Sequence, residues 1–373
     1  MPNRDIPPNI AHSLLPDASN IFTWLNHPLP LLLNAVKPSD PQDFFSTDEP
    51  TTVDIPALRS IPCPPKRIVD ALCSSIKQSP TTKSICCPHA SINQQNERLP
   101  LFMLTCWAKL TLLYPAKKQV STALRILEHH RSPLQDSESR SLSNDVYTML
   151  TLLPWQDSIR GFPVEVPIHH LTAFFRTEWL GSEHIFLMTD LLEDDARANG
   201  VIRTEFIKET AAFTTKMAQA YNNPEGYATS QGFRWLSTIG QRLANREQDH
   251  LALVANINAN HWVAIIIDIN GHTIQYGNSL RGYETGSREL LDQLKWWLHF
   301  HFGEMFSVKH LPITQQCDGH NCGIFAWQAL EAEVLGKELM SEKDAYKKRL
   351  ELFKRVIQRH QDMVRFSPAW YSG

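Results

Sequence analysis

The chain is organised around a cysteine that stands directly before an apolar run, in residues 315–326, Gln-Gln-Cys-Asp-Gly-His-Asn-Cys-Gly-Ile-Phe-Ala. From Cys322 onward apolar residues recur at helical spacing, so we expect a buried helix to begin at or just after this cysteine. A thiol at a helix N-terminus lies near the positive end of the helix dipole and near unpaired backbone N–H groups. Both favour the thiolate, which is the nucleophilic form.

Neighbouring residues indicate how this cysteine could act. Gly323 has no side chain next to the sulfur, so we expect a substrate backbone to come close there. Gln316, six residues before Cys322, is a neutral donor of the kind that stabilises an oxyanion. Two rivals, Cys317 and His320, lie in the same loop, but the first lacks the following glycine and the second is too close in sequence to act as base. The sequence therefore predicts that Cys322 is the nucleophile.

A predicted β-hairpin supplies the base. His261 opens a β-branched run of strand length, which is typical of a strand buried on both faces. The dipeptide 270–271, Asn-Gly, separates this run from the next and is a strong hairpin signal. Counting through a two-residue turn pairs Val263 roughly with Asn278, so Asn278 returns beside His261. A histidine held by an asparagine side chain is the orienting arrangement that a Cys–His pair uses.

This set of residues resembles the ubiquitin-like-protein-specific cysteine proteases, best known as SUMO-deconjugating enzymes. Residues 316–323 follow the pattern Gln-x-x-Gly-x-x-Cys-Gly, which is close to the family's motif, spacing included. Residues 178–185, Glu-Trp-Leu-Gly-Ser-Glu-His-Ile, resemble the family's Trp-Leu-Asn-Asp segment. The resemblance covers roughly residues 165–340. It implies an α+β papain-like cysteine protease fold, in which a helical part carries the cysteine and a sheet carries the histidine and asparagine.

The resemblance also implies a role for each residue. The implied catalytic residues are the base His261, the orienting Asn278, the oxyanion donor Gln316 and the nucleophile Cys322. The implied substrate-binding residues are Trp179, Trp262 and Gly323, of which the two tryptophans clamp the diglycine tail of the modifier. The implied partner is a ubiquitin-like modifier, SUMO-type first, with its conjugates. A thiolate–imidazolium pair then attacks the carbonyl of the modifier's last glycine, and neither a metal nor an organic cofactor is implied.

The chain departs from the family pattern at three places. Asn278 stands where the family usually has Asp, Asn321 stands before the nucleophile where Asp is usual, and residues 181–182 read Gly-Ser instead of Asn-Asp. Asn can still fix the imidazole tautomer, but it lacks the charge that stabilises imidazolium, so we expect a slower enzyme. Two other classes stay open: a modifier-binding module that has lost turnover, and an acyltransferase on the same fold, although no basic cluster for an acyl-CoA or inositol phosphate lies near the motif.

Composition limits the function classes. The chain has 373 residues, 42% of them hydrophobic, and a formal net charge of −3, which argues against a generic polyanion binder such as a nucleic-acid-binding protein. The N-terminus lacks the apolar region of a signal peptide, and residues 28–36 are too short and too proline-rich to span a bilayer. Seven cysteines, an odd count without a secretory signal, predict reduced thiols in the nucleus or cytoplasm.

Three regions are expected along the chain. Residues 1–62, rich in proline, predict a loosely ordered arm; residues 63–160 predict a helical extension of unknown role; and residues 161–373 predict the catalytic domain. In the extension, residues 100–131 form a helical tract whose Trp and Met stripe predicts core packing. Cys73, Cys86, Cys87 and His89 do not have Cys-x-x-Cys spacing, so no metal site is predicted.

The catalytic region predicts further elements around the site. Expected helices cover residues 168–179, 182–192, 204–221, 230–244, 287–302 and 342–364, and a strand covers 306–311. Two of these helices form a long insert between Trp179 and His261, where substrate selection could be built. In the last helix, the run 347–349, Lys-Lys-Arg, predicts a solvated face.

Overall fold

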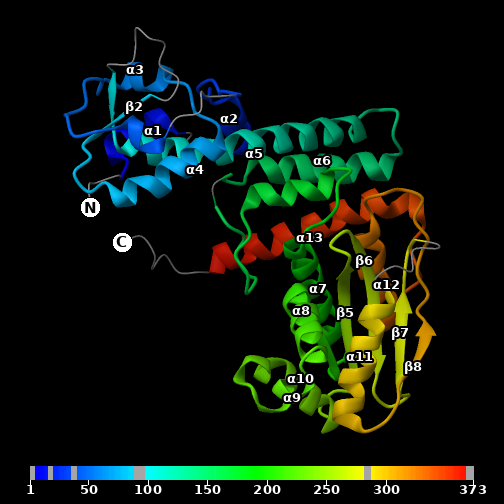
Figure 1. The fold of residues 1–373 in the computed structure, drawn as a ribbon. Coiled ribbons are helices and arrows are strands. Elements are labelled where there is room, and N and C mark those ends of the chain that lie inside the picture. Colours follow the sequence, from blue (N-terminus) through cyan, green and yellow to red (C-terminus); the bar gives the residue numbers. More distant parts are fainter. Residues whose placement is uncertain are drawn as a thin grey trace. The chain divides into compact units, whose positions relative to one another are not determined.

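The computed structural model describes residues 5–15, 20–34, 40–87, 97–155, 157–280 and 287–366. The chain forms two compact units: the first holds Met1–Arg125 and Leu150–Asp157, and the second holds Ile126–Met149 and Ser158–Gly373 (Figure 1). This division differs from the three expected regions, because residues 1–62 share one unit with part of the helical extension. Residues 126–149 belong with the predicted catalytic region. Each unit is described by itself below.

The first unit combines short helices with a small sheet. Its elements are α1 (Pro8–Leu14), α2 (Ile21–Asn26), η1 (Pro41–Phe44), β1 (Phe45–Ser46), α3 (Ile55–Ser60), α4 (Lys66–Ser75), η2 (Ile76–Gln78), β2 (Ser84–Cys86), β3 (Arg98–Pro100) and the larger part of α5 (Phe102–His130). The three strands pair antiparallel in the order β1-β2-β3. Ile21 and Trp24 are fully buried, and Trp24 stacks on Trp155. The arm predicted for residues 1–62 is therefore partly built into this core.

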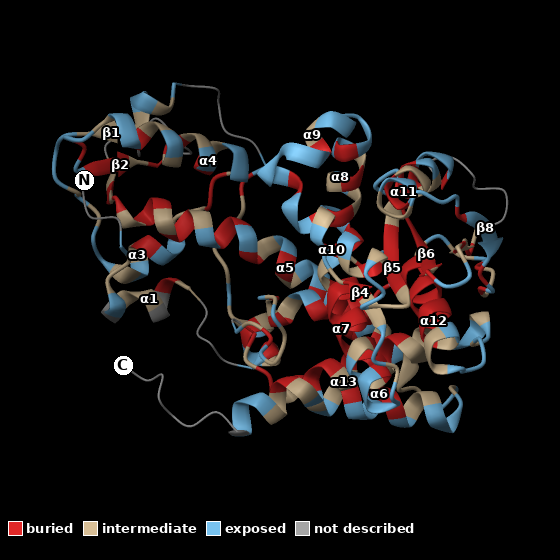
Figure 2. Ribbon diagram, turned by 90° about the horizontal axis from the view of Figure 1, so that it is seen from below, coloured by how far each residue is buried: buried red, intermediate tan, exposed pale blue. Residues whose placement is uncertain are grey.

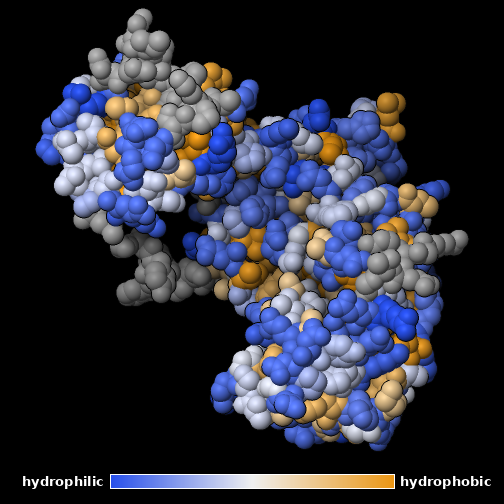
Figure 3. All heavy atoms as spheres, in the orientation of Figure 1, coloured by the Kyte–Doolittle hydropathy of each residue, from blue (hydrophilic) through white to orange (hydrophobic). Residues whose placement is uncertain are grey.

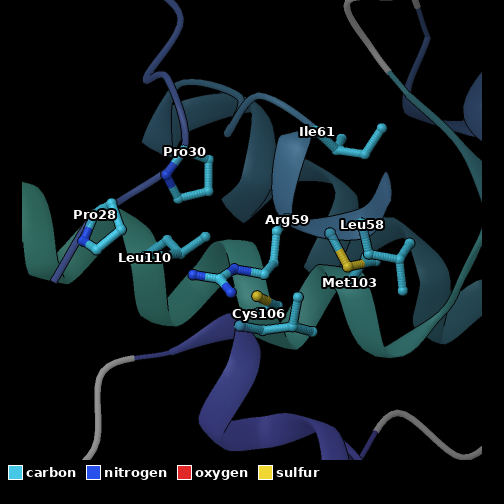
Figure 4. Close-up of a pocket in the computed structure, with 9 residues that line it drawn as sticks. Pro28, Pro30, Leu58, Arg59, Ile61, Met103, Cys106 and Leu110 are labelled. Carbon is cyan, nitrogen blue, oxygen red and sulfur yellow. The ribbon is translucent and has the colours of Figure 1, made fainter. Parts of the chain in front are cut away.

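The predicted core stripe of residues 100–131 is confirmed, since Met103, Trp107 and Leu110 are buried on α5. A cavity of about 20 Å³ lies beside this helix, lined mainly by apolar side chains together with Arg59 and Cys106 (Figure 4). A cavity of this size holds about one water molecule. It is therefore a packing gap of the first unit and not a substrate pocket.

The second unit is built on a five-stranded sheet. Its strands are β4 (Thr204–Ile207), β5 (His250–Ile257), β6 (His261–Asp268), β7 (Thr273–Gly277) and β8 (Ser307–His310), in the order β4-β5-β6-β7-β8. Its helices are α6 (Ser137–Thr151, which ends in the first unit), η3 (Ile168–Phe175), α7 (Ser182–Ala198), α8 (Thr210–Tyr221), α9 (Pro224–Thr229), η4 (Gln231–Phe233), α10 (Arg234–Ala244), α11 (Ser287–Phe302), α12 (Cys322–Leu335), η5 (Glu342–Asp344) and α13 (Ala345–Phe366).

Helices cover both faces of this sheet. Successive side chains of a strand point to opposite faces. One face of β5 and β6, with Leu253 and Ile265, packs in one core with α8, α10 and α11. α12 packs against β6 and β5 and against α7. This explains why β5, β6 and α12 are almost entirely buried (Figure 2) and why the strands read as continuous apolar runs. The expected α+β papain-like fold is confirmed: a helix carries Cys322 and the sheet carries His261.

The hairpin register agrees with the prediction. β6 and β7 pair antiparallel, with Ala264 opposite Gly277, so the next position aligns Val263 with Asn278. The connection is longer than the expected two-residue turn, because pairing stops at Asp268 and Thr273. Ile269 instead donates its N–H to Asp249 at the far end of β5, which removes it from the ladder.

Two expected helices differ in the structure. Residues 204–207, the start of the helix expected over 204–221, form β4, which pairs parallel with β5 along the sheet edge. The Thr-Glu-Phe-Ile sequence fits a strand once a partner edge is available, and this tertiary pairing overrides helix propensity. Residues 168–175 form the 3₁₀ helix η3 and not a longer helix to Trp179.

The predicted solvated run on the last helix is wrong at one position. Arg349 is 1% exposed, and Lys348 pairs with the buried Glu331 at 2.8 Å. Lys347 and Lys348 both stay partly exposed, and Lys347 pairs with the exposed Glu138 on α6. Because Arg349 lies three residues after Tyr346 and four before the buried Phe353, it faces the core side of α13.

The structure can also be searched for membrane-spanning helices and metal sites. Within the described ranges, no helix is both long and apolar enough to cross a membrane, and no group of His, Cys, Asp and Glu could hold a metal ion. His89 of the rejected metal set lies outside the described residues. Figure 3 shows hydrophilic residues over most of the face that it draws. None of the seven cysteines, all of which lie within the described residues, forms a disulfide, and the compartment expected from their count stays a prediction.

Candidate active site

A tight turn places His261 at the start of β6. β5 ends at Ile257, and its partner across the turn is His261. Asn258 and Ala259 adopt φ values of 54° and 55°, the left-handed pair that suits a reversal between twisted antiparallel strands. The side chain of His261 is 2% exposed. The turn therefore fixes the imidazole in the protein interior at the end of the sheet.

Asn278 orients that imidazole. His261 Nε2 lies 2.8 Å from Asn278 Oδ1. The backbone N–H of Leu280 donates to the same Oδ1 at 2.9 Å, so this atom is the carbonyl oxygen and the histidine must donate from Nε2. A neutral imidazole protonated on Nε2 has its lone pair on Nδ1. The hydrogen bond thus selects the tautomer in which Nδ1 can accept a proton.

Cys322 is the first residue of α12, where the sequence predicts it, and it is 2% exposed. Burial raises the pKa of the Cys322 thiol, while the backbone N–H groups of Trp262 and Gly323 and the charge of Arg349 act in the opposite direction. The hydrogen bond from Trp262 also shows that the sulfur lies at the start of β6, next to His261. Cys322 thus lies where the N-terminus of α12 contacts β6, the strand that begins at His261.

The pKa values of this pair are shifted by burial. Burial lowers the pKa of His261, although the hydrogen bond to Asn278 acts against it, while the pKa of Cys322 is raised. Both shifts favour uncharged forms, because a buried site stabilises neither the thiolate nor the imidazolium. The helix N-terminus alone does not outweigh this desolvation. Both pKa directions thus act against the predicted thiolate–imidazolium pair.

Gln316 is held in place by two neighbours. Its Oε1 accepts from Ser279 Oγ at 2.7 Å, and its Nε2 donates to the carbonyl of Asp318 at 2.9 Å. The side chain is 9% exposed. Nε2 carries two hydrogens, so the bond to Asp318 uses one of its two donors. Ser279 follows Asn278 directly, so the segment after β7 contacts both His261 and Gln316.

The two predicted clamp residues have different environments. Trp179 is 49% exposed, and its indole N–H donates to the carbonyl of Gly319 in the loop before the nucleophile. Trp262 is 4% exposed, and its indole N–H donates to the carbonyl of Leu180 at 2.9 Å. The tryptophans thus bind the loop before Cys322 and the residue after Trp179. Their role as a clamp stays a prediction.

Gly323 has a packing role that differs from the expected one. A Cβ built on this glycine would lie 3.1 Å from Ile185 Cδ1 and 3.2 Å from Trp262 Cδ1. The space on the Cβ side of this glycine is therefore filled by Ile185 of α7 and Trp262 of β6, and its role beside a substrate backbone stays a prediction. Its missing side chain lets α12 approach the sheet closely, which is what brings Cys322 to His261.

Cys317 and His320, the two alternative candidates in the loop, make other contacts. Cys317 is exposed, and its backbone N–H donates to Glu342. His320 lies beside Asp318, with 3.5 Å between its Nδ1 and a carboxylate oxygen. The structure therefore brings His261, Asn278, Gln316 and Cys322 together and leaves these two outside the set.

Sequence reasoning missed the residues that support this set. Asp318 Oδ1 accepts from the backbone N–H groups of His320 and Asn321, and its Oδ2 accepts from Asn321 Nδ2 at 2.8 Å. Asn321 Oδ1 in turn accepts from Arg349 Nε at 2.7 Å. The helical position of Arg349 on the apolar face of α13 was a usable signal, whereas nothing local pointed to Ser279.

Comparison with known proteins gives one family. The sequence model "Ulp1 protease family, C-terminal catalytic domain" matches residues 178–363. A curated relative, the "Deubiquitinase and deneddylase Dub1" of Chlamydia trachomatis serovar L2b (strain UCH-1/proctitis), is 26% identical over 151 residues, which are 38% of this chain and 37% of the relative. The chain thus spans little more than a third of that relative's length.

Two solved structures illustrate the similar folds. The C-terminal Ulp1 protease domain in complex with Smt3, the yeast ortholog of SUMO, is 21% identical, with a TM-score of 0.46, covering 59% of this chain and 95% of that one. The Xanthomonas campestris effector protein XopD bound to ubiquitin is 18% identical, with a TM-score of 0.33, covering 47% of this chain and 91% of that one.

Proposed function

Residues 178–363 belong to the Ulp1 protease family, a family of cysteine-type peptidases, and from this premise we propose that the protein hydrolyses the bond after the C-terminal Gly-Gly of a ubiquitin-like modifier. The observation that supports it most is the meeting of Cys322 and the oriented His261 at one end of the sheet, with Gln316 on the adjoining loop. Nucleophile, base and oxyanion donor are the groups that acyl transfer requires.

The proposed reaction starts from the uncharged pair. His261 Nδ1 takes the proton of the Cys322 thiol as the sulfur attacks the carbonyl carbon of the last glycine. The resulting oxyanion accepts hydrogen bonds from Gln316 Nε2 and from the backbone N–H of Cys322. The imidazolium then protonates the leaving amine, and the thioester is released by a water that His261 deprotonates. Asn278 keeps the ring in the tautomer that each step needs.

The proposed substrate filter is the pair of tryptophans. Trp179 lies over Gly319 of the loop before Cys322, and Trp262 follows the base directly. A tail that passes between these residues to the sulfur would have to be thin, which favours glycine at the last two positions of the modifier. Such a filter distinguishes a peptidase for modifier tails from an acyltransferase, which would need room for an acyl carrier.

Two kinds of modifier are candidate substrates. The motif resemblance favours a SUMO-type modifier, for either precursor processing or deconjugation. The curated relative, by its name, acts on ubiquitin and on the neddylation modifier, and this favours those two. We therefore propose the class of ubiquitin-like modifiers with a diglycine tail and leave the choice to experiment.

The test is hydrolysis of fluorogenic substrates in which SUMO, ubiquitin or NEDD8 carries a reporter amide on its last glycine. We expect one of the three to be cleaved by the wild-type chain, and Cys322→Ala to lower the rate by at least 1,000-fold, on the order expected for loss of a nucleophile. Cys317→Ala is the matched control, because it removes an exposed thiol five residues away. Binding of a modifier without cleavage would instead support the inactive binding module.

A further inference from the structure

Arg349 is a buried cation whose five N–H donors are all used. Its Nε donates to Asn321 Oδ1 at 2.7 Å. One terminal nitrogen donates to the carbonyls of Ala173 and Arg176 at 3.0 and 2.9 Å, and the other to the carbonyls of Glu178 and His320 at 2.9 Å each. A guanidinium presents five donors in a fixed fork, so this arrangement sets the relative positions of all five acceptors.

Those acceptors lie on segments that are far apart in sequence but adjacent at the site. Ala173, Arg176 and Glu178 form the end of η3 and the approach to Trp179, and we call residues 173–179 the Trp179 segment. The other two acceptors belong to residues 316–321, which we call the nucleophile loop. Arg349 itself lies on α13. One side chain thus ties a proposed substrate-binding segment to the loop that precedes Cys322.

The charge of Arg349 has few direct counter-charges. Its acceptors are four backbone carbonyls and one amide oxygen, and burial lowers its pKa to about 10, so it remains protonated at neutral pH. The groups that interact with it electrostatically are Asp318, Cys322, Tyr346 and Arg176. The carboxylate of Asp318 is linked to it through the amide of Asn321. Asp318 thus carries the negative charge that the family usually places directly before the nucleophile.

We infer that Arg349 is a positioning residue for the proposed reaction: it holds the Trp179 segment and the nucleophile loop in one arrangement and places a permanent positive charge beside Cys322. This inference rests on the proposed role of Cys322 as nucleophile. The amide of Asn321 is part of the device, since it donates to Asp318 and accepts from Arg349. Removing the charge should make the thiolate harder to form, and removing the fork should loosen the proposed clamp.

The first test measures the reactivity of Cys322 without any modifier. Iodoacetamide alkylation of Cys322 is followed by peptide mass spectrometry from pH 6 to 10 in the full chain. We expect Arg349→Gln to slow alkylation at pH 8 about tenfold and to shift the curve to higher pH by about one unit. Arg349→Lys keeps the charge and should leave this curve close to wild type. It should raise KM for the cleaved modifier more than it lowers kcat, because the fork that holds the Trp179 segment is lost.

The matched control is Arg359→Gln on the same helix. Arg359 pairs with Asp190 at 2.6 Å and with Asp194, so its loss weakens the attachment of α13 to α7. It should lower the melting temperature and leave the alkylation curve unchanged. If Arg349→Gln has no larger effect on the curve than Arg359→Gln, the inference is overturned.

If Arg349→Gln does not fold, a second set of variants tests the same inference by exchanging the carboxylate and the amide of residues 318 and 321. Asn321→Asp alone puts a second carboxylate against Asp318 Oδ2 and should slow alkylation of Cys322 several-fold. Asp318→Asn with Asn321→Asp restores one carboxylate and one amide, and the carboxylate then accepts directly from Arg349. We expect this double variant to recover most of the wild-type rate; recovery no better than in the single variant contradicts the role of the link. The alkylation results hold even if no modifier is cleaved, so they are separable from the proposed function.

Discussion

The opposite pKa shifts of His261 and Cys322 predict how the site responds to pH. A thiol whose pKa lies above its ordinary value of 9.0 is almost entirely protonated at pH 7. Its thiolate fraction then rises about tenfold for each pH unit. We therefore expect the alkylation rate of Cys322 in the wild-type chain to rise about tenfold from pH 7 to pH 8. A rate that is flat over this range would indicate a preformed thiolate–imidazolium pair and would contradict the uncharged ground state.

Substituting Asn278 by Asp should increase the activity of the enzyme. Asn278→Asp keeps an acceptor for His261 Nε2 and for the N–H of Leu280, and adds the charge that stabilises imidazolium. The pKa of His261 should rise, and kcat/KM for the cleaved modifier should increase on the order of tenfold, which corresponds to about one pKa unit. Steady-state kinetics of the variant and wild type measure this. Equal or lower activity would show that missing charge does not limit the rate.

The close packing of α12 at Gly323 should affect the free energy of unfolding, independently of catalysis. Gly323→Ala inserts a methyl group between Ile185 and Trp262, and overpacking of this kind costs about 1–3 kcal/mol. Urea unfolding should show this loss. Gly319→Ala is the control in the adjoining loop, because no atom lies within 4 Å of its added Cβ. Adding Ile185→Val removes the nearer methyl and should restore part of the stability; no restoration would place the strain elsewhere.

The elements that the sequence predicts well are those whose signals are local. The helix that begins at Cys322 follows from apolar spacing within fourteen residues. The register that returns Asn278 to His261 follows from the Asn-Gly dipeptide at 270–271 and two apolar runs. β4 could not be predicted in the same way, because its residues become a strand only by pairing with β5, more than forty positions away.

The contacts of Arg349 that hold the site together could not be predicted from the sequence for the same reason. Arg349 donates to one backbone carbonyl that lies 29 residues away and to three that lie more than 170 residues away. Backbone carbonyls carry no sequence signature, so no motif could reveal these contacts. The packing role of Gly323 could not be predicted either, because it depends on the positions of Ile185 and Trp262, which lie far away in sequence.

The division of the whole chain predicts where it can be cut. The second unit includes residues 126–149, and this segment contacts α13 through the stack of His130 on Tyr346 and the ion pair of Lys354 with Asp145 at 2.6 Å. We expect a fragment of residues 126–373 to fold and to cleave the same modifier as the full chain. A fragment of residues 158–373 should melt several degrees lower, because it loses these contacts. Equal melting temperatures would favour the boundary near residue 161 that the sequence alone suggests.

The proposed attack of Cys322 on the last glycine of a modifier can be trapped as a covalent adduct. SUMO, ubiquitin and NEDD8, each with an electrophile in place of the last carboxylate, are incubated with the full chain, and the modified cysteine is mapped by mass spectrometry. We predict a covalent adduct with at least one modifier, located on Cys322, present in Cys317→Ala and absent in Cys322→Ala. An adduct on another cysteine, or none with any of the three, would contradict the claim.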